Sequence, residues 1–181
     1  MKSTTFKKDL YRWYGEAGES LKDRILRPNE IKYVYWLRKA QEAQNRITRI
    51  FAKLKLDNLS RKTNIQISPS TVIGEGFYIG HCGRVIVNPQ AVLGKNVNIG
   101  TGVTIGQENR GERKGVPTLG DNVWIGTNSV IVGNITIGND VLIAPLTFVN
   151  FDIPDHSIVV GNPAKIIQRE CATEGYINRT V

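Results

Sequence analysis

The sequence predicts a parallel β-helix, a coil of short strands stacked along one axis. Two observations predict it: an aliphatic residue recurs at six-residue steps between Ile67 and Val149, and glycine often follows that residue. Such short repeats bury their apolar face only against neighbouring repeats, which is typical of β-helices. One step holds a short strand and a turn, and three steps would close a triangular coil, giving about four coils. The aliphatic positions are Ile67, Ile73, Ile79, Val87, Leu93, Ile99, Ile105, Leu119, Ile125, Ile131, Ile137, Ile143 and Val149.

The repeat is interrupted twice, and we expect function at the interruptions. Between Ile79 and Val87 the step is eight residues, and the additional residues surround His81. Between Ile105 and Leu119 the step is fourteen residues, so a loop over residues 107–115 leaves the coil. A regular scaffold tends to carry its functional residues in such surface insertions.

The length and the pattern together predict three parts. The chain of 181 residues suits one main domain with an appendage. We expect a helical N-terminal segment over residues 1–62, the β-helix over residues 63–167 and a C-terminal tail over residues 168–181. The tail is polar from Glu170 onward and is expected to fray.

The chain has no apolar run long enough for a transmembrane helix and no apolar signal core at its start. Its two cysteines, Cys82 and Cys171, form no disulfide framework pattern. These features favour a reduced, cytoplasmic protein.

The formal net charge of +8 belongs to the N-terminal segment. Residues 21–62 hold twelve basic and four acidic side chains, whereas residues 63–181 hold eight basic and nine acidic ones. The sequence contains no helix-turn-helix, zinc-ligand or aromatic-basic pattern, so we do not expect nucleic-acid binding.

Three helical patterns precede the six-residue repeat of aliphatic positions, which we call the grid. The first covers Phe6 to Tyr14, and residues 15–20 break it. The second begins at Pro28, which suits a first helical turn, and continues to about Gln44. The third is amphipathic and basic: one stripe holds Ile47, Ile50, Phe51, Leu54 and Asn58, with Leu56 outside it, and the other side holds Arg46, Arg49, Lys53 and Lys55. Its apolar stripe would pack on the coil or a neighbouring subunit, or contact an anionic membrane surface or a lipid-phosphate-linked substrate.

The grid carries turn residues and a closing segment. Residues 157–167 predict a final strand and turn after the chain leaves the grid at residues 151–155. The expected turn positions, where asparagine tolerates left-handed backbone, are Asn96, Asn98, Asn128, Asn134 and Asn139.

Four features together resemble the hexapeptide-repeat acyltransferases: the grid, the long step at His81, the loop before Leu119 and the turn Gly161-Asn162-Pro163-Ala164-Lys165. Within these enzymes the chain is most similar to the serine O-acetyltransferase branch, including its small relatives in capsule and exopolysaccharide gene clusters. The resemblance covers about residues 64–167. It implies a left-handed β-helix, a homotrimer with active sites between subunits, and acetyl-CoA as the donor.

The chain departs from the serine enzymes at three positions. Gly80 stands before His81 where those enzymes have aspartate, and Gln66 replaces a second aspartate. The loop ends in Gly115-Val116-Pro117 rather than in Arg-His-Pro. The groups that would hold a zwitterionic amino acid are therefore missing, and the short N-terminal segment does not match that family's long helical domain.

His81 is the predicted general base. A neutral imidazole near pH 7 suits removal of the proton from an attacking hydroxyl. The alternative is a histidine with a structural role in a turn. As a base, His81 would be oriented by a backbone carbonyl or by a carboxylate of a neighbouring subunit. Cys82 is a poor nucleophile candidate, because adjacent residues on an extended chain point opposite ways. His156 is expected to be a turn residue.

The donor site follows from the resemblance. It implies that the pantetheine arm of acetyl-CoA runs along the coils past Gly106, Thr127 and Ala144, and it places Lys165 as a phosphate partner near the end of the coil. No metal is expected. Backbone N–H groups at the glycine-rich turns would stabilise the oxyanion.

Four further residues are candidate ligand contacts. Arg110, Arg113 and Lys114 would contact the acceptor or the donor phosphates, or else lie in solvent. Trp124 would line the cleft or pack on the N-terminal helices.

The main hypothesis is an acetyl-CoA-dependent O-acetyltransferase that modifies a sugar hydroxyl of a capsular polysaccharide or exopolysaccharide, or of its lipid-linked precursor. The lost amino-acid-binding groups and the basic N-terminal segment motivate it. The alternatives are a serine O-acetyltransferase with an altered site and a non-catalytic hexapeptide-repeat scaffold. A metal-binding coil is weaker, because His81 and His156 are the only histidines and three are needed.

Overall fold

The N-terminal segment is helical in the computed structural model, which describes residues 4–181. Its elements are α1 (Thr4–Tyr14), the 3-10 turn η1 (Gly15–Ala17), α2 (Leu21–Ile25), α3 (Asn29–Gln41) and α4 (Arg46–Thr63). The first three residues of the expected helical part lie outside the described residues. None of the helices in residues 4–181 has the length and apolarity that crossing a bilayer requires.

Local capping explains where these helices begin and end. The side chain of Asn45 accepts a hydrogen bond from Thr48 N and begins α4, and Asn64 ends α4 with left-handed backbone. Short helix α2, which the sequence pattern did not predict, begins with a capping box between Ser20 and Asp23. The other expected helices correspond to α1, α3 and α4.

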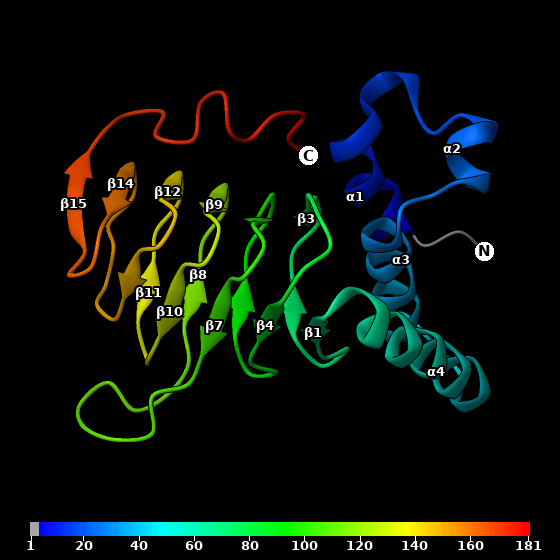
Figure 1. The fold of residues 1–181 in the computed structure, drawn as a ribbon, viewed down its shortest axis with the longest axis horizontal. Helices are drawn as coiled ribbons and strands as arrows, with labels where there is room; N and C mark the ends of the chain where they lie inside the picture. Colours follow the sequence, from blue (N-terminus) through cyan, green and yellow to red (C-terminus); the bar gives the residue numbers. More distant parts are fainter. Residues whose placement is uncertain (1–3) are drawn as a thin grey trace.

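The rest of the chain forms three sheets, in which all strands pair in parallel except β14 and β15, and this confirms the predicted parallel β-helix (Figure 1). Sheet A has the order β1 (Ile65–Ile67), β4 (Val85–Val87), β7 (Thr104–Gly106), β10 (Val130–Val132) and β13 (Phe148–Val149). Sheet B has the order β11 (Thr136–Ile137), β8 (Thr118–Leu119), β5 (Val92–Leu93) and β2 (Val72–Ile73). Sheet C has the order β15 (Lys165–Gln168), β14 (Ser157–Val160), β12 (Val141–Ile143), β9 (Val123–Ile125), β6 (Asn98–Ile99) and β3 (Tyr78–Ile79).

Every third strand belongs to the same sheet, so three steps of the repeat close one coil. We name the three edges of the coil by the sheets that they join. The A–B edge includes the turn after β4 and the loop after β7, the B–C edge includes the turns after β2, β5, β8 and β11, and the C–A edge includes the turns after β3, β6, β9 and β12.

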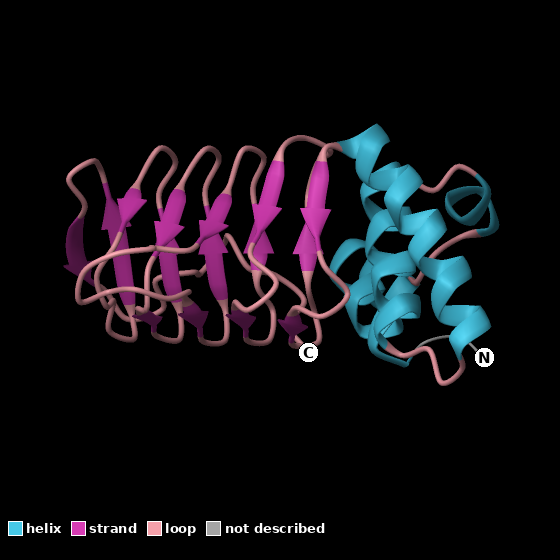
Figure 2. Cartoon of the chain, turned by 90° about the horizontal axis from the view of Figure 1, so that it is seen from below, coloured by secondary structure: helices cyan, strands magenta, loops and turns pink. Residues whose placement is uncertain are grey.

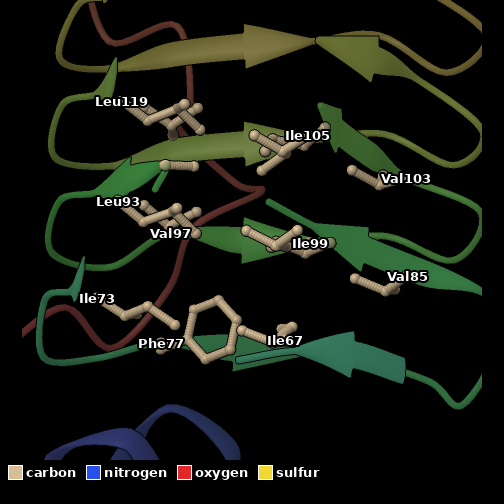
Figure 3. Close-up of a cluster of buried hydrophobic side chains, with 14 of the residues drawn as sticks. Ile67, Ile73, Phe77, Val85, Leu93, Val97, Ile99, Val103, Ile105 and Leu119 are labelled. Carbon is tan, nitrogen blue, oxygen red and sulfur yellow. The ribbon is translucent and has the colours of Figure 1, made fainter. Parts of the chain in front are cut away.

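The core is the stack of aliphatic side chains that the six-residue grid predicts. All thirteen grid positions are buried, at 8% exposure or less. Figure 3 shows Ile67, Ile99 and Ile105 with their neighbours pointing into the coil. The register pairs Ile67 with Val87, and Val87 with Ile105, so each coil stacks grid residue on grid residue.

Glycine is required on the B–C edge because successive coils approach closely there. A Cβ atom at Gly74 would lie 2.5 Å from the backbone oxygen of Gly94 in the next coil. No side chain fits at that distance, which explains why glycine recurs at the same step of the next coils.

Two expectations about turns need correction. Asn96 and Asn128 do have left-handed backbone, but Asn134 and Asn139 do not. Asn98 lies in strand β6 instead, where it is buried and accepts a hydrogen bond from Arg12 Nη2 at 2.7 Å. Its side-chain amide links the coil to α1, a role that the preference of asparagine for turns cannot predict.

The stripe predicted on α4 is not its packing face. The buried residues of this helix are Ala52, Leu56 and Thr63. Ile47 is 82% exposed and Leu54 is 63% exposed. The periodicity correctly showed two faces, but Leu56, which lies outside the stripe, packs on the coil.

The helices cover the first coil at one end of the molecule (Figure 2). They satisfy its unpaired backbone groups with side chains. The Tyr33 hydroxyl accepts from Ile67 N at 2.9 Å, and Arg38 donates to Ile73 O at 2.8 Å. Arg12 Nη1 donates to Gly76 O at 2.7 Å.

A buried ion pair holds this cap together. Arg38 Nε donates to Asp9 Oδ2 at 2.7 Å, and both side chains are almost fully buried. Asp9 Oδ1 also accepts from Phe77 N at 2.9 Å. The pair therefore links α1 and α3 to the first coil.

The C-terminal tail is ordered, contrary to the expected fraying. It runs back along the coil from β15 to the helices (Figure 1). Asp140 accepts hydrogen bonds from Ala172 N, Thr173 N and the Thr173 hydroxyl. Arg179 donates to Trp13 O, which joins the end of the tail to α1.

We expect Asp9→Ala to lower the free energy of unfolding by about 3–5 kcal/mol, because it leaves the buried Arg38 guanidinium without its carboxylate. Urea unfolding followed by circular dichroism measures this change. The control is Glu112→Ala in the exposed loop, which should cost less than about 0.5 kcal/mol. Equal stability of the two variants would contradict the role of the pair.

We expect Asp140→Ala to release the tail, so that amides of residues 172–181 exchange at least about tenfold faster in hydrogen-exchange mass spectrometry. Burial raises the pKa of Asp140, but hydrogen bonds from Thr173, His156 and Ala172 outweigh it and lower the value to about 2. The folded-state pKa is depressed, so the stabilisation is present above about pH 4 and is lost as the pH falls toward 2.

Wild-type tail amides should therefore lose protection in that acidic range before those of the coil. The control is Asp121→Ala, which removes a hydrogen bond to Lys95 N on the same edge without touching the tail. Unchanged tail exchange in Asp140→Ala would show that another contact holds the tail.

Candidate functional site

His81 lies on the C–A edge, in the turn between β3 and β4. The eight-residue step makes this turn longer than the others on the edge. His81 is exposed, and it forms no hydrogen bond with any of the residues 4–181. The histidine is therefore free to meet a ligand or a neighbouring subunit.

A hollow of about 300 Å³ opens beside His81. None of its side chains is a carboxylate, ammonium or guanidinium group, and two of them, Tyr78 and Trp124, are aromatic. Its lining consists of Tyr78, Gly80, His81, Asn98, Ile99, Gly100, Thr101, Trp124 and Thr127. This composition suits an uncharged, ring-bearing ligand better than a zwitterion.

Trp124 lines this hollow and contacts the tail rather than the N-terminal helices. Its ring lies 4.9 Å from the ring of Tyr176, at an angle of 62°. Asn98 Nδ2 donates to Tyr176 O at 3.4 Å. The tail thus forms one border of the candidate site. The expectation of a frayed tail had excluded this role.

The expected donor residues do not all lie on one edge. Thr127 and Ala144 follow β9 and β12 on the C–A edge, so they belong to the same edge as His81 in later coils. Gly106 ends β7 at the A–B edge. Lys165 begins β15, five strand steps from β3 in sheet C, or about 24 Å at about 4.8 Å a step.

Unpaired backbone donors lie on the C–A edge. The N–H groups of Gly100 and Gly126 are used by the sheet, because they donate to Ile125 O and Ile143 O. The following N–H groups, of Thr101 and Thr127, donate to no group in residues 4–181. Thr101 was not among the predicted residues, although its place one coil before Thr127 is a signal in the repeat.

The long loop leaves the coil at the A–B edge. Glu108 and Gly115 exchange two backbone hydrogen bonds, of 2.9 and 3.0 Å, and close its base. Arg110, Arg113 and Lys114 are exposed in it. Within one chain, the loop and His81 lie on different edges of sheet A.

A second hollow, of about 540 Å³, lies between α4 and the A–B edge. Gln66 and Gly106 line it, together with Lys53 and Asp57 from α4. The last two are the only charged side chains in its lining. They stand one helical turn apart, so they offer one positive and one negative group.

Cys82 has no role as a nucleophile in this geometry. Its Sγ donates to Glu30 Oε2 at 3.1 Å. Partial burial, and then the hydrogen bond and charge of Glu30, raise the pKa of the Cys82 thiol to about 11. The reactive thiolate is therefore scarce at neutral pH.

His156 is a turn residue, as expected, with a φ of +55°. It also contacts Asp140, the residue that holds the tail, because its Nδ1 lies 2.9 Å from Asp140 Oδ2. The hydrogen bond to Asp140, opposed by desolvation, raises the pKa of His156. The residues described from 4 to 181 contain no cluster of histidine, cysteine, aspartate and glutamate that could hold a metal ion.

Comparison with known proteins finds a hexapeptide-repeat family that matches part of the coil. Residues 117–150 match the family described as bacterial transferase hexapeptide (six repeats). The matched residues include Trp124, Thr127 and Ala144, but not His81.

Similar proteins include serine acetyltransferases. The enzyme of Bacillus pumilus is 34% identical over 131 residues, which cover 68% of this chain and 60% of that enzyme. The chain therefore spans less than two thirds of that curated relative. The crystal structure of Neisseria gonorrhoeae serine acetyltransferase in complex with serine superimposes with a TM-score of 0.75 at 29% identity, covering 91% of this chain and 68% of that one.

A serine acetyltransferase solved in complex with CoA shares the fold, with a TM-score of 0.71 at 24% identity over 90% of this chain and 67% of that one. These likenesses confirm the predicted left-handed β-helix and its similarity to serine acetyltransferases. They do not support the narrower capsule or exopolysaccharide type.

The raised pKa of Cys82 predicts slow alkylation. In a Cys171→Ser variant, which leaves Cys82 as the only thiol, we expect the rate with iodoacetamide at pH 8 to lie about a hundredfold below that of an ordinary exposed cysteine thiol. Glu30→Gln should increase this rate several-fold, because it removes the carboxylate charge. Mass spectrometry over time measures both rates. A fast reaction that Glu30→Gln leaves unchanged would restore Cys82 as a nucleophile candidate.

Proposed function

We propose that this chain transfers the acetyl group of acetyl-CoA to a hydroxyl group of a small acceptor. One observation carries the proposal: His81, in the eight-residue step of the coil, has no hydrogen-bond partner among residues 4–181 and lies beside a hollow on the C–A edge. The likeness to serine acetyltransferases supports acetyl transfer as the reaction.

His81 would act as the general base. Its neutral imidazole takes the hydroxyl proton while the acceptor oxygen attacks the thioester carbonyl, and the C–S bond then breaks. The imidazolium returns the proton to the departing CoA thiolate, so protons and charges balance. A correctly placed base contributes about 10²–10⁴ in rate.

The unpaired N–H groups of Thr101 and Thr127 suit the donor. An extended pantetheine arm carries amide carbonyls that such groups can bind, and its path would follow the C–A edge from His81 past Ala144. Lys165, at the far end of sheet C, is then the proposed partner of the donor phosphates. Gly106 and the loop residues Arg110, Arg113 and Lys114 lie on another edge.

We propose that the working unit is a homotrimer, in which the A–B edge of one subunit meets the C–A edge of the next. This arrangement brings Gly106 and the long loop of one subunit to His81 of its neighbour. It also gives His81 an orienting partner, which it lacks among the described residues of its own chain.

L-serine is the first acceptor to test. The relatives are named for it, and the hollow beside Gln66 offers Lys53 and Asp57, which could hold its carboxylate and its ammonium group. In the trimer this hollow, on the A–B edge, would face His81 of the next subunit. The site would then be an altered serine site, in which charged side chains of α4 take the place of the acidic groups that are absent at Gly80 and Gln66.

A sugar hydroxyl is the second candidate acceptor. The observation that favours it is the uncharged hollow beside His81, with the rings of Tyr78 and Trp124 in its wall. Sugar rings pack well on aromatic faces, and their hydroxyl groups need no ionic partner. The relatives give this acceptor no support, so the polysaccharide hypothesis now ranks behind serine.

The test is CoA release from acetyl-CoA, measured with L-serine and with a panel of oligosaccharides. We expect His81→Ala to lower kcat by a factor of about 10²–10⁴ with the true acceptor. The matched control is His156→Ala, which removes the only other histidine and should keep the activity.

The outcomes separate the candidates. Release with serine, lost in Lys53→Ala and Asp57→Ala, supports the altered serine site. Release with a glycan alone supports the sugar acceptor. Full activity in His81→Ala would overturn the proposed base, and no CoA release with any acceptor would favour a non-catalytic scaffold.

A further inference from the structure

The outer face of α4 is an exposed apolar stripe. Ile47 is 82% exposed, Leu54 is 63% exposed, and Ile50 and Phe51 are about half exposed. The ring of Phe51 meets the ring of Trp36 at 5.6 Å, and Lys55 Nζ lies over it at 5.4 Å. Four large apolar side chains on one helical face are an unusual surface for water.

The exposure follows from the direction of the helix. Leu54 and Leu56 stand two residues apart, so they point about 200° apart around the axis. Because Leu56 and Ala52 are buried against the protein, the stripe necessarily faces away from it. The stripe is therefore a second, solvent-facing side of α4, separate from the side that packs on the protein.

Basic residues border the stripe on both sides. The helix carries six exposed basic residues and one acidic residue, Asp57. The basic residues are Arg46, Arg49, Lys53, Lys55, Arg61 and Lys62. None of them forms an ion pair with any residue from 4 to 181.

Exposed apolar residues are concentrated at this end of the molecule. Seven of the twelve large exposed apolar side chains belong to residues 21–54, including Leu21, Ile25 and Leu26 in and after α2. Both α2 and α4 belong to the helical end of the molecule (Figures 1 and 2). The other five are spread over the remaining described residues, 4–20 and 55–181.

We propose that α4 binds the surface of an anionic lipid bilayer, with its apolar stripe among the acyl chains and its basic borders at the headgroups. A helix with apolar and basic faces lies in the plane of such a surface. Each lysine or arginine near an anionic leaflet adds to the attraction. An 18-residue helix is about 27 Å long, enough to place all four apolar side chains in the interface together.

Charge distinguishes this occupant from a second copy of the chain. If two α4 helices packed stripe against stripe, the basic borders of one would meet those of the other. The like charges would repel each other, and only Asp57 is available on each helix to compensate. An anionic surface compensates every one of these cations.

Vesicle flotation tests the proposal and needs neither acetyl donor nor acceptor, so it is independent of the proposed reaction. We expect the full chain to bind vesicles of phosphatidylcholine mixed with phosphatidylglycerol, and to bind pure phosphatidylcholine vesicles at least about tenfold more weakly. Added salt should weaken the binding, because it screens the headgroup charge.

Two variants separate the stripe from its borders. We expect Ile47→Ser/Ile50→Ser/Leu54→Ser and Arg46→Glu/Lys55→Glu each to bind mixed vesicles at least about tenfold more weakly. Matched controls on the coil, Val72→Ser/Ile166→Ser/Ile167→Ser and Arg84→Glu/Arg169→Glu, should bind like the wild type. All these positions are exposed, and circular dichroism verifies folding.

Sedimentation equilibrium of the wild type and the stripe variant completes the test. Equal binding to both kinds of vesicle, or full binding by the stripe variant, would overturn the proposal. So would an assembly that the stripe variant halves in mass without any vesicle binding, since a second copy would then cover α4.

Discussion

A β-helix must close its ends, and in this chain the closure of the first coil sets the positions of α1 and α3. The strands β1, β2 and β3 have no preceding coil to bond with, so their outer backbone groups would be unsatisfied under any apolar cover. Tyr33, Arg38, Asp9 and Arg12 supply the missing hydrogen bonds from α1 and α3. Because Arg38 and Asp9 are also each other's counter-charge, neither helix can be moved without exposing a buried charge to an apolar surface.

Because the coils stack in register, equivalent residues of successive coils lie above one another. The register of sheet C places residues of equal step above one another, so the edge after β3 continues in the turns after β6, β9 and β12. A histidine in the first of these turns therefore begins a line that continues with Thr101 and Thr127, while Ala144 continues the neighbouring line of Gly80, Gly100 and Gly126. The extra residues around His81 disturb only one turn, since the ladders on either side, at Ile79 and Val85, keep their partners.

The sequence could predict the coil almost completely, because the six-residue period from Ile67 to Val149 leaves room for one short strand and one turn at each step, while the left hand of the coil came from the family resemblance. It could not predict which face of α4 packs, since both Leu54 and Leu56 are apolar and the choice depends on the coil beneath. It could also not predict the path of the tail, which depends on Asp140, a residue more than thirty positions away from Thr173. His81 was found by an irregularity in the repeat, whereas Thr101 and Tyr176 needed the three-dimensional arrangement.

The three edges of the coil are used differently, and this limits where chemistry can occur. The tail occupies the B–C edge through Asn96 and Asp140, and the helices close one end of the coil. The C–A edge and the A–B edge stay open, one with His81 and unpaired N–H groups, the other with the long loop and the hollow beside Gln66. Because sheet A separates the two open edges within a chain, they can meet only between chains. A complete site would therefore be formed by assembly of subunits rather than by folding of one chain alone.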